Sequence, residues 1–298
     1  MQIRPFRRED APGLVDLALY CARGETDFVL NPYWETEEEL LAEFERFGIA
    51  PEEHLLVADA GDGEVLGLVG FLRRPGASLA GLFCPIVKRG ERGRGIGGEL
   101  LRAVRELGRS KLGIRLATAA IGTRNRAGYS LLTSLGFHPV RQHFLMRCDR
   151  KPEAPATPIA GLELDDGSAD DANAILSIYT ICGFEERSLE RMERVLADER
   201  HVHVVARQGE RVVAFTEIET HWPRRVWVAY VGVDPEFRDR GLGSALVARA
   251  LERLFEAGSH TALLLLSPAN RTALRAYEKV GFRRHRVIDV LESSFVQP

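Results

Sequence analysis

The sequence predicts two consecutive α/β domains, each with a mixed sheet flanked by helices. A six-residue phrase occurs twice, about 146 residues apart, as RGRGIG at 92–97 and as RDRGLG at 238–243. Each copy follows an apolar, strand-like run and begins an amphipathic helical pattern. Asn125 and Asn270 then each precede a Gly-Phe pair at the same spacing. Matches in the same order in both halves indicate an internal duplication.

The length of the chain and a proline-rich stretch set the expected domain boundaries. A chain of 298 residues suits two domains, each large enough to bury a core. Residues 151–158 contain three prolines and few apolar side chains, which is typical of a linker. We therefore expect an N-terminal domain at 1–150 and a C-terminal domain at 159–298. The first half carries about a dozen extra residues, which we place around 31–35.

Strands and helices alternate along the first half. Apolar runs bounded by turn residues predict strands at 54–58, 65–71, 79–87, 115–120 and from 137 onward. Apolar residues at helical spacing predict helices at 96–107 and 127–134. The first of these helices follows the glycine-rich phrase directly.

The second half repeats this order. Strands are predicted at 201–206, 211–219, 226–233, 261–266 and from 282 onward, and helices at 242–255 and 270–279. The strand at 261–266 is apolar throughout, as expected for a strand covered on both faces. Gly281 ends the last helix in the way that a C-terminal glycine does.

Composition excludes several classes of protein. The formal net charge of −3 argues against a general nucleic-acid binder. No apolar run approaches the roughly 20 residues that a transmembrane helix needs, and the N-terminus lacks a signal-peptide pattern. The four cysteines form no close pair, so we expect a reduced, cytoplasmic protein.

The repeated phrase has the properties of a phosphate site. A glycine-rich turn at the start of a helix presents unpaired backbone N–H groups together with the positive end of the helix dipole. Gly241 and Gly243 let the backbone approach phosphates without a Cβ, and Arg238 and Arg240 add positive charge. Alternatively, the two arginines are ordinary solvent-exposed residues at the start of a helix and bind no phosphate. Two copies predict a unit that binds a phosphorylated cofactor.

Together these residues resemble the GNAT superfamily of N-acetyltransferases. The resemblance rests on Arg-x-x-Gly-x-Gly after a strand and on Asn270, Tyr277 and the Gly-Phe pair at 281–282. It covers nearly the whole chain as two tandem copies. It implies a mostly antiparallel sheet in each domain, splayed where the cofactor binds. The implied cofactor is acetyl-CoA, with its pyrophosphate on the glycine-rich turn and its pantetheine on the splayed strand.

The resemblance also assigns cofactor-binding roles to individual residues. The splayed strand would supply Val231, Gly232 and Val233, where Gly232 allows a close backbone approach. Asn270 would lie near the pantetheine arm, serve as an ordinary helix N-cap, or do both. The turns would hold pyrophosphate through Arg238, Asp239, Arg240, Gly241, Leu242, Gly243 and Ser244 in the second half, and through Arg92, Gly93, Arg94, Gly95, Ile96, Gly97 and Gly98 in the first half.

Tyr277 is the general acid that the resemblance implies. Its hydroxyl would protonate the departing thiolate, and a thiol with a pKa near 8.5 suits a phenol with a pKa near 10. The alternative is a core aromatic with a solvated hydroxyl. Leu132 occupies the matching position of the first half, and leucine cannot donate a proton. We therefore expect the chemistry in the second half, and a structural, regulatory or vestigial role for the first.

A general base is needed as well, because an alkylammonium with a pKa near 10 must lose a proton before it attacks a thioester. The candidates are Glu217, Glu219 and His221, with Glu219 preferred. Alternate strand residues share a face, so both carboxylates point into the cleft or both point into solvent. We expect no metal site, because His201 and His203 share a face without a nearby cysteine or acidic partner.

The sequence thus predicts an acetyl-CoA-dependent N-acetyltransferase that acts by direct attack in a ternary complex. The acceptor is a small-molecule amine, or a peptide N-terminus or lysine, with no nucleic-acid or membrane partner. The chain is expected to be a monomer or homodimer. One alternative is a non-catalytic acyl-CoA-binding module that senses cofactor level. Another is acetylation of a cysteinyl-sugar amine, as in mycothiol synthase, a tandem member with a similar layout.

Overall fold

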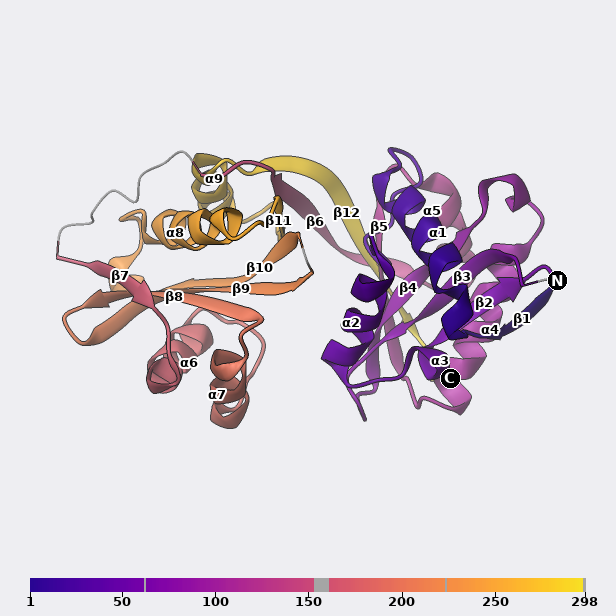
Figure 1. Ribbon diagram of the computed structural model, residues 1–298, viewed down its shortest axis with the longest axis horizontal. Helices are drawn as coiled ribbons and strands as arrows, with labels where there is room; N and C mark the ends of the chain where they lie inside the picture. Colours follow the sequence, from indigo (N-terminus) through magenta and orange to yellow (C-terminus); the bar gives the residue numbers. More distant parts are fainter. Residues whose placement is uncertain (62, 153–160, 223, 297–298) are drawn as a thin grey trace. The chain divides into compact units, whose positions relative to one another are not determined.

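The protein is described by a computed structural model that covers residues 1–61, 63–152, 161–222 and 224–296 (Figure 1). The chain divides into two compact units. The first unit comprises Met1–His143 and Arg286–Pro298, and the second unit comprises Phe144–His285. The linker expected at 151–158 lies mostly outside the described residues.

The two compact units do not coincide with the two halves of the sequence, because the end of each half's last strand pairs in the sheet of the other half. Strand β6 (His138–Cys148) begins in the first unit, but from Phe144 onward it pairs with β11 (Thr261–Leu266) in the second. Strand β12 (Arg283–Ser294) begins in the second unit, yet from Ile288 onward it pairs with β5 (Leu116–Gly122) in the first. The expected division at 1–150 and 159–298 does not include this exchange of strand ends.

Core packing accounts for the exchange. Leu291 and Phe295, from the end of β12, are buried in the hydrophobic core of the first unit. Met146 and Cys148, from the end of β6, are buried in a core of the second unit. Each unit therefore buries apolar side chains that come from the other half of the sequence.

In the first unit, the described strands lie in the order β1 (Gln2–Pro5), β2 (Leu55–Asp59), β3 (Val65–Leu72), β4 (Leu79–Val87), β5 and the end of β12. Neighbouring strands are antiparallel except for β4 and β5. The helices are α1 (Ala11–Arg23), α2 (Glu37–Phe47), α3 (Pro51–His54), α4 (Ile96–Ser110) and α5 (Arg126–Ser134), with short 3-10 turns at Arg8–Asp10 and Arg89–Glu91.

The second unit has the same plan. Its described strands lie in the order β7 (Glu163–Asp166), β8 (His201–Gln208), β9 (Arg211–Trp222), β10 (Arg225–Val233), β11 and the end of β6, and only β10 and β11 are parallel. The helices are α6 (Ala172–Ile181), α7 (Leu189–Ala197), α8 (Leu242–Glu256) and α9 (Arg271–Val280), with 3-10 turns at Ala169–Asp171 and Pro235–Phe237. The expected mixed, mostly antiparallel sheets are confirmed.

Both sheets open where their parallel strands separate. β10 pairs with β11 only from Arg225 to Trp227, although both strands continue beyond that point. β4 likewise pairs with β5 only from Leu79 to Leu82. The register with the preceding strand shifts between Val228 and Tyr230 in β10, which is the kind of irregularity that bends a strand away from its neighbour. The splay expected from the sequence is therefore present in both units.

The sheet of the second unit carries helices on both faces. Leu246, Val247 and Leu251 of α8 pack in one core with Ile218 of β9. Phe215 of β9 packs on the opposite face, in the core formed with α6 and α7 (Figure 1). Successive strand residues point to opposite faces, so Glu217 and Glu219 share the α6/α7 face with Phe215.

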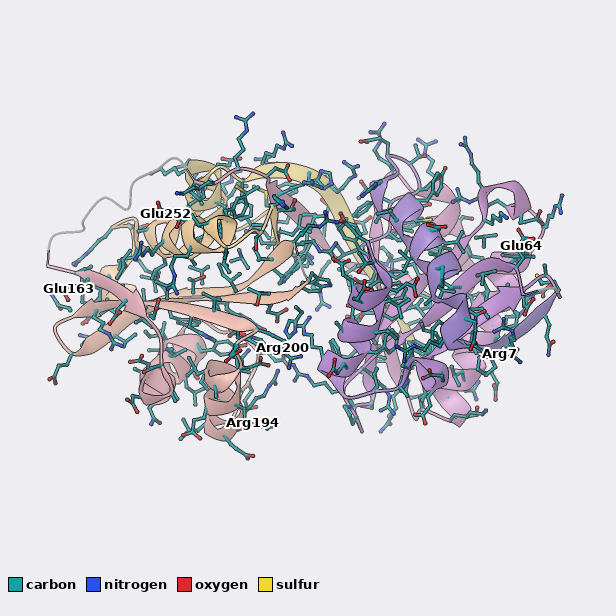
Figure 2. The ribbon with its side chains drawn as sticks, viewed as in Figure 1. Arg7, Glu64, Glu163, Arg194, Arg200 and Glu252 are labelled. Atoms are coloured by element: carbon teal, nitrogen blue, oxygen red, sulfur yellow. The ribbon has the colours of Figure 1, made fainter. Side chains whose placement is uncertain are left out.

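Helix α7 is amphipathic, with one side packed on the sheet and the other side in solvent. Met192 is fully buried against the sheet, whereas Arg194 points outward to solvent (Figure 2). The part of the chain that the structure describes contains no helix with the length and hydropathy that a bilayer span requires.

Leu291→Ala, close to the C-terminus, should destabilise the first unit. Leu291 is fully buried there, and truncating a buried leucine costs about 2–5 kcal/mol through the lost contacts and the cavity left behind. The measurement is urea unfolding followed by Trp34 fluorescence, with Trp222→Phe and Trp227→Phe in the background so that Trp34 is the single tryptophan. Val290→Ala, at a half-buried neighbour, is the control and should cost less. An unchanged Trp34 transition in Leu291→Ala would contradict the exchange.

Candidate active site

The two glycine-rich turns adopt the same backbone conformation. Gly93 and Gly95 have φ angles of 80° and 86° in the first unit. The matching residues of the second unit, Asp239 and Gly241, have φ angles of 61° and 83°. Aspartate tolerates this left-handed region better than most side chains, so the replacement of Gly93 by Asp239 leaves the turn intact. The duplicated phrase is therefore a duplicated structure.

Each turn ends as the N-cap of a long helix. Gly95 caps α4 and Gly241 caps α8, and neither glycine supplies a side chain to the helix N–H groups. Within the described residues, the N–H groups of Leu242 and Gly243 make no hydrogen bond. These unpaired donors and the positive end of the α8 dipole form a site that can accept phosphate.

The first arginine of each phrase anchors the turn to the strand before it. Arg238 Nε donates to the Val233 carbonyl at 3.2 Å, and Arg92 Nε donates to the Val87 carbonyl at 3.0 Å. Arg238 and Arg92 therefore shape the turn as well as adding charge. Of the second arginines, Arg94 pairs with Glu91 at 2.8 Å, and Arg240 donates to the Glu236 carbonyl at 3.0 Å.

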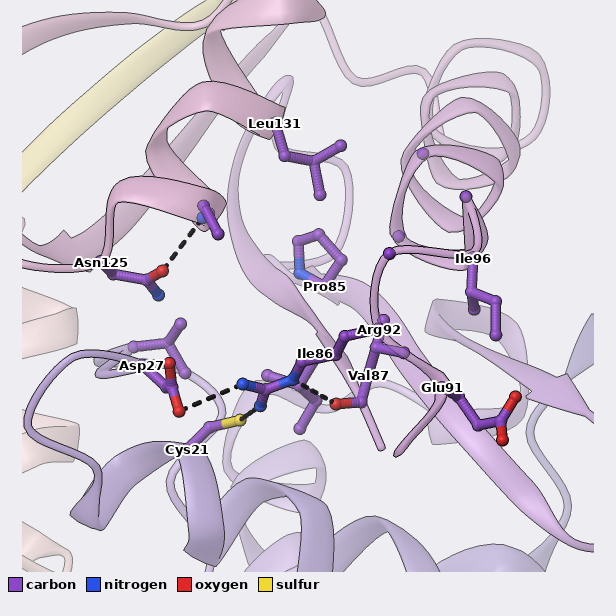
Figure 3. Close-up of a pocket in the computed structure, with 17 residues that line it drawn as sticks. Cys21, Asp27, Pro85, Ile86, Val87, Glu91, Arg92, Ile96, Asn125 and Leu131 are labelled. Carbon is purple, nitrogen blue, oxygen red and sulfur yellow. Dashed lines mark hydrogen bonds and ion pairs between the residues drawn. The ribbon is translucent and has the colours of Figure 1, made fainter. Parts of the chain in front are cut away.

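A pocket of about 340 Å³ lies beside the turn of the first unit (Figure 3). It is bounded by the end of β4, the glycine-rich turn and α5. Figure 3 shows the Arg92 side chain directed toward Asp27, Cys21 and the Val87 carbonyl, and the ion pair with Asp27 is 3.1 Å long. The first unit has thus kept a cavity at the place where the phrase predicts a cofactor.

Asn125 and Asn270 are helix N-caps. Asn125 Oδ1 accepts from the Gly128 N–H at 3.0 Å, and Asn270 Oδ1 accepts from the Ala273 N–H at 3.1 Å. These bonds satisfy helix N–H groups that would otherwise lack a partner. The structural half of the expectation for Asn270 is confirmed, and its role beside pantetheine stays a prediction.

Tyr277 and Leu132 occupy the same position of α9 and α5, seven residues after the capping asparagine. Leu132 is buried in the first core. Tyr277 is half-buried beside Phe282, at a ring separation of 5.6 Å, and packs on the core that contains Leu242. Burial raises the pKa of Tyr277 well above the usual phenol value, so its hydroxyl stays protonated at neutral pH.

The first unit also lacks both carboxylates of β9. Val233 pairs with Ala214 in the second unit, and Val87 pairs with Gly67 in the first. Counting along the strands from these pairs shows that Gly70 is the first-unit equivalent of Glu217, and that Leu72 is the equivalent of Glu219. Sequence reasoning missed this difference, although the same count along the predicted strands was available.

Glu217 is buried, and both of its carboxylate oxygens have hydrogen-bonding partners. Its side chain is 1% exposed, and its Oε2 receives a hydrogen bond from Arg187 at 2.8 Å. His201 Nδ1 lies 3.2 Å from Oε1, and His203 Nε2 lies 3.7 Å from Oε2. Burial alone would raise the pKa of Glu217, but His201, His203 and the Arg187 charge outweigh it and hold that pKa well below its usual range.

Arg187 holds this network in place and was not singled out from the sequence. Its guanidinium lies over the Tyr179 ring at 4.7 Å and over the Tyr230 ring at 5.2 Å. Phe184 packs against both rings. The sequence placed Arg187 at the start of an amphipathic run, and no local pattern marks it as the partner of a glutamate 30 residues later.

Glu219 lies next to this network on the same face. It is 8% exposed and stands directly opposite His201 of β8 in the strand register. One ring nitrogen of His201 and one carboxylate oxygen from each of Glu217 and Glu219 lie within 4.8 Å of one another, as the ligands of a metal ion could. The expectation that the histidines lack an acidic neighbour is therefore wrong, because β8 and β9 pair side by side. Both oxygens of Glu217 are used by Arg187 and His201, so we assign no metal here.

Glu217→Gln should destabilise the second unit, because it leaves the buried Arg187 without its counter-ion at a cost of about 3–5 kcal/mol. The pKa of Glu217 is lower in the folded state, so its stabilising effect is present above the unfolded pKa of about 4.3 and is lost as the pH falls below it. Urea unfolding between pH 7 and pH 3 should therefore show a steeper loss for the wild type than for the variant.

The control for this prediction is Glu190→Gln, which breaks an exposed pair with Arg194 and should cost less than about 1 kcal/mol. Equal effects of the two substitutions would contradict the central place of Glu217 in the network.

Comparison with known proteins agrees with this geometry. The acetyltransferase (GNAT) family model matches residues 22–137 and again residues 172–282. Proteins named mycothiol acetyltransferase are similar along most of the chain. The one from Thermomonospora curvata is 30% identical over 83% of this chain and 88% of its own, and the one from Amycolatopsis mediterranei is 29% identical over 78% and 81%.

Solved structures share the fold. A GCN5-related N-acetyltransferase from Sphaerobacter thermophilus superposes with a TM-score of 0.80 at 20% identity, covering 99% of this chain and 96% of its own. A tandem GNAT protein from the clavulanic acid biosynthesis pathway gives 0.74 at 20% identity, covering 100% and 99%. The chain therefore belongs to the acetyltransferase (GNAT) family, carries two tandem copies of its domain, and is an acyltransferase.

Proposed function

We propose that the chain transfers an acetyl group from acetyl-CoA to the primary amine of a small molecule, and that the second unit performs the reaction by direct attack in a ternary complex. One contrast carries this proposal. The second unit combines the glycine-rich turn with Tyr277, Glu217 and Glu219, whereas the first has Leu132 in place of the tyrosine and no carboxylate at the two matching strand positions.

The donor would lie along the opening between β10 and β11. The unpaired N–H groups of Leu242 and Gly243 and the left-handed Gly241 suit a pyrophosphate. The backbone of Val231, Gly232 and Val233 lies beyond the last pairing with β11, so it has amide groups to offer pantetheine. The thioester supplies the activated acetyl group, and these residues would bind and orient it.

Tyr277 would act as the general acid. Its hydroxyl is held protonated by burial, and it makes no hydrogen bond within the described residues. The raised pKa makes this hydroxyl a weaker acid than an ordinary phenol, so its proton would move as negative charge builds up on the departing sulfur, whose conjugate thiol has a pKa near 8.5. The contact of Tyr277 with the core around Leu242 and Val231 supports a position beside the donor.

Glu219 would accept the proton of the amine, directly or through a water molecule. Glu217 is a weak base, because its network holds its pKa low. Glu219 lies on the same face of β9, beside the network, and keeps the role preferred from the sequence. Glu217 would orient the groups around it.

The names of the relatives favour one acceptor class. Proteins called mycothiol acetyltransferase are about 30% identical to this chain over most of its length, which supports a small-molecule amine rather than a protein lysine. A cysteinyl-sugar amine is the second candidate, and it would react through the same residues. A panel of small amines, cysteinyl sugars and peptides, read by release of the CoA thiol, distinguishes these acceptors from each other and from a module that only binds the cofactor.

Tyr277→Phe should lower kcat by about 10²–10⁴ with little change in the KM for acetyl-CoA, because it removes the proton donor and leaves the fold intact. The measurement is steady-state release of CoA thiol with an accepted amine. Tyr129→Phe, on the matching helix of the first unit, is the control and should behave as the wild type. Full activity of Tyr277→Phe would remove the general acid from the proposal.

Calorimetric titration with acetyl-CoA should give two sites, because both turns have the same backbone and the first unit keeps a pocket. Gly241→Asp and Gly95→Asp form a matched pair, since each places a negative side chain at a left-handed N-cap. Each should remove one site, and only Gly241→Asp should abolish turnover. Loss of turnover in Gly95→Asp alone would move the active centre to the first unit, and no binding at all would reject the function.

A further inference from the structure

His201 lies between the two carboxylates of β9. It is the first residue of β8, where the strand register places it opposite Glu219. Its ring Nδ1 is 3.2 Å from the Oε1 atom of Glu217. No step of the proposed reaction has used this imidazole, although it contacts one candidate base and neighbours the other.

The contact with Glu217 determines which ring nitrogen is available. The lowered pKa keeps Glu217 ionised, and a carboxylate accepts hydrogen bonds, so Nδ1 must carry the hydrogen. In the neutral ring, Nε2 then holds the lone pair. Nε2 makes no hydrogen bond within the described residues, and the side chain is 11% exposed.

Glu217 is suited to hold this imidazole in one orientation. Arg187 fixes the carboxylate at 2.8 Å, and the rings of Tyr179 and Tyr230 fix Arg187. A rigid, ionised carboxylate behind Nδ1 stabilises the imidazolium that forms when Nε2 takes a proton. The same rigidity makes Glu217 itself a poor proton acceptor.

We propose that His201 carries the acceptor's proton from Glu219 to solvent, with Glu217 as the group that orients it. This rests on the proposed function. The N–H bond of the ammonium breaks as an O–H bond forms on Glu219. One ring nitrogen of His201 and one carboxylate oxygen of Glu219 lie within 4.8 Å of each other, so a water molecule can connect the two side chains. The proton then moves through that water to Nε2 of His201, and Nε2 passes it to bulk water. Glu219 returns to its carboxylate form.

Other titratable or charged groups face the same space. They come from α6, the segment before α7, β8, β9 and β10, and are Tyr179, Arg187, His203, Glu217, Glu219, His221 and Tyr230. His203 is buried at 1% side-chain exposure, and its Nε2 points at Glu217, so it has no route to solvent. His201 differs from it in reaching solvent while contacting the same carboxylate.

The test uses two variants of the full chain that separate orientation from proton transfer. His201→Asn can still donate to Glu217 from its amide, whose nitrogen sits close to the former Nδ1, but it has nothing at the Nε2 position. His201→Ala removes both and leaves space for a free imidazole. We expect each to lower kcat by roughly tenfold or more, with the KM for both substrates nearly unchanged. Added imidazole should restore His201→Ala and leave His201→Asn slow.

The outcomes separate this inference from the function on which it rests. A wild-type kcat in His201→Asn at every pH from 6 to 9 would overturn the inference, because orientation alone would then suffice. A failure of imidazole to restore folded His201→Ala would also overturn it, with folding checked by the unfolding midpoint. Glu219→Gln tests the function separately: if it retains full activity, the general base is wrong, whereas a slow Glu219→Gln with an active His201→Asn rejects only the proton carrier.

Discussion

The parallel pairing of β10 with β11 ends after Trp227, and the rest of the site depends on that ending. Had the two strands stayed paired, their amide groups would be satisfied by each other and no opening would exist. The register shift between Val228 and Tyr230 is an irregularity of the kind that bends a strand away from its neighbour. The same strand places the Tyr230 ring against the Arg187 guanidinium, so the opening and the Glu217 network are joined by one strand.

The two units have the same backbone plan and differ in the side chains that the proposed reaction uses. The turns agree in φ even where Asp239 replaces Gly93. The strand position of Glu217 is Gly70 in the first unit, and a Cβ there would lie 2.4 Å from the Leu55 side chain. A carboxylate therefore cannot be restored at Gly70 without repacking that core. Packing around Gly70, as well as Leu132 at the position of Tyr277, therefore separates the first unit from the proposed reaction.

Local spacing in the sequence predicted the turns, the capping asparagines and the contrast between Tyr277 and Leu132, because each depends on neighbours within one or two elements. The Arg187–Glu217 pair and the exchange of strand ends were not predictable in this way. Arginine is usually exposed, and only tertiary packing buries Arg187, which lies just before α7. The ends of β6 and β12 have the same strand pattern, and only core contacts decide which sheet each one joins.

The exchanged strand ends also determine the order in which the two units can be completed during synthesis. A ribosome makes the chain from its N-terminus, so most of the first unit emerges early. Its sheet nevertheless needs the residues from Ile288 onward, which are translated after the second unit. The second unit is continuous in sequence, and its segment Phe144 to Cys148 is translated before its partner strand β11. The unit translated first is consequently the one completed last.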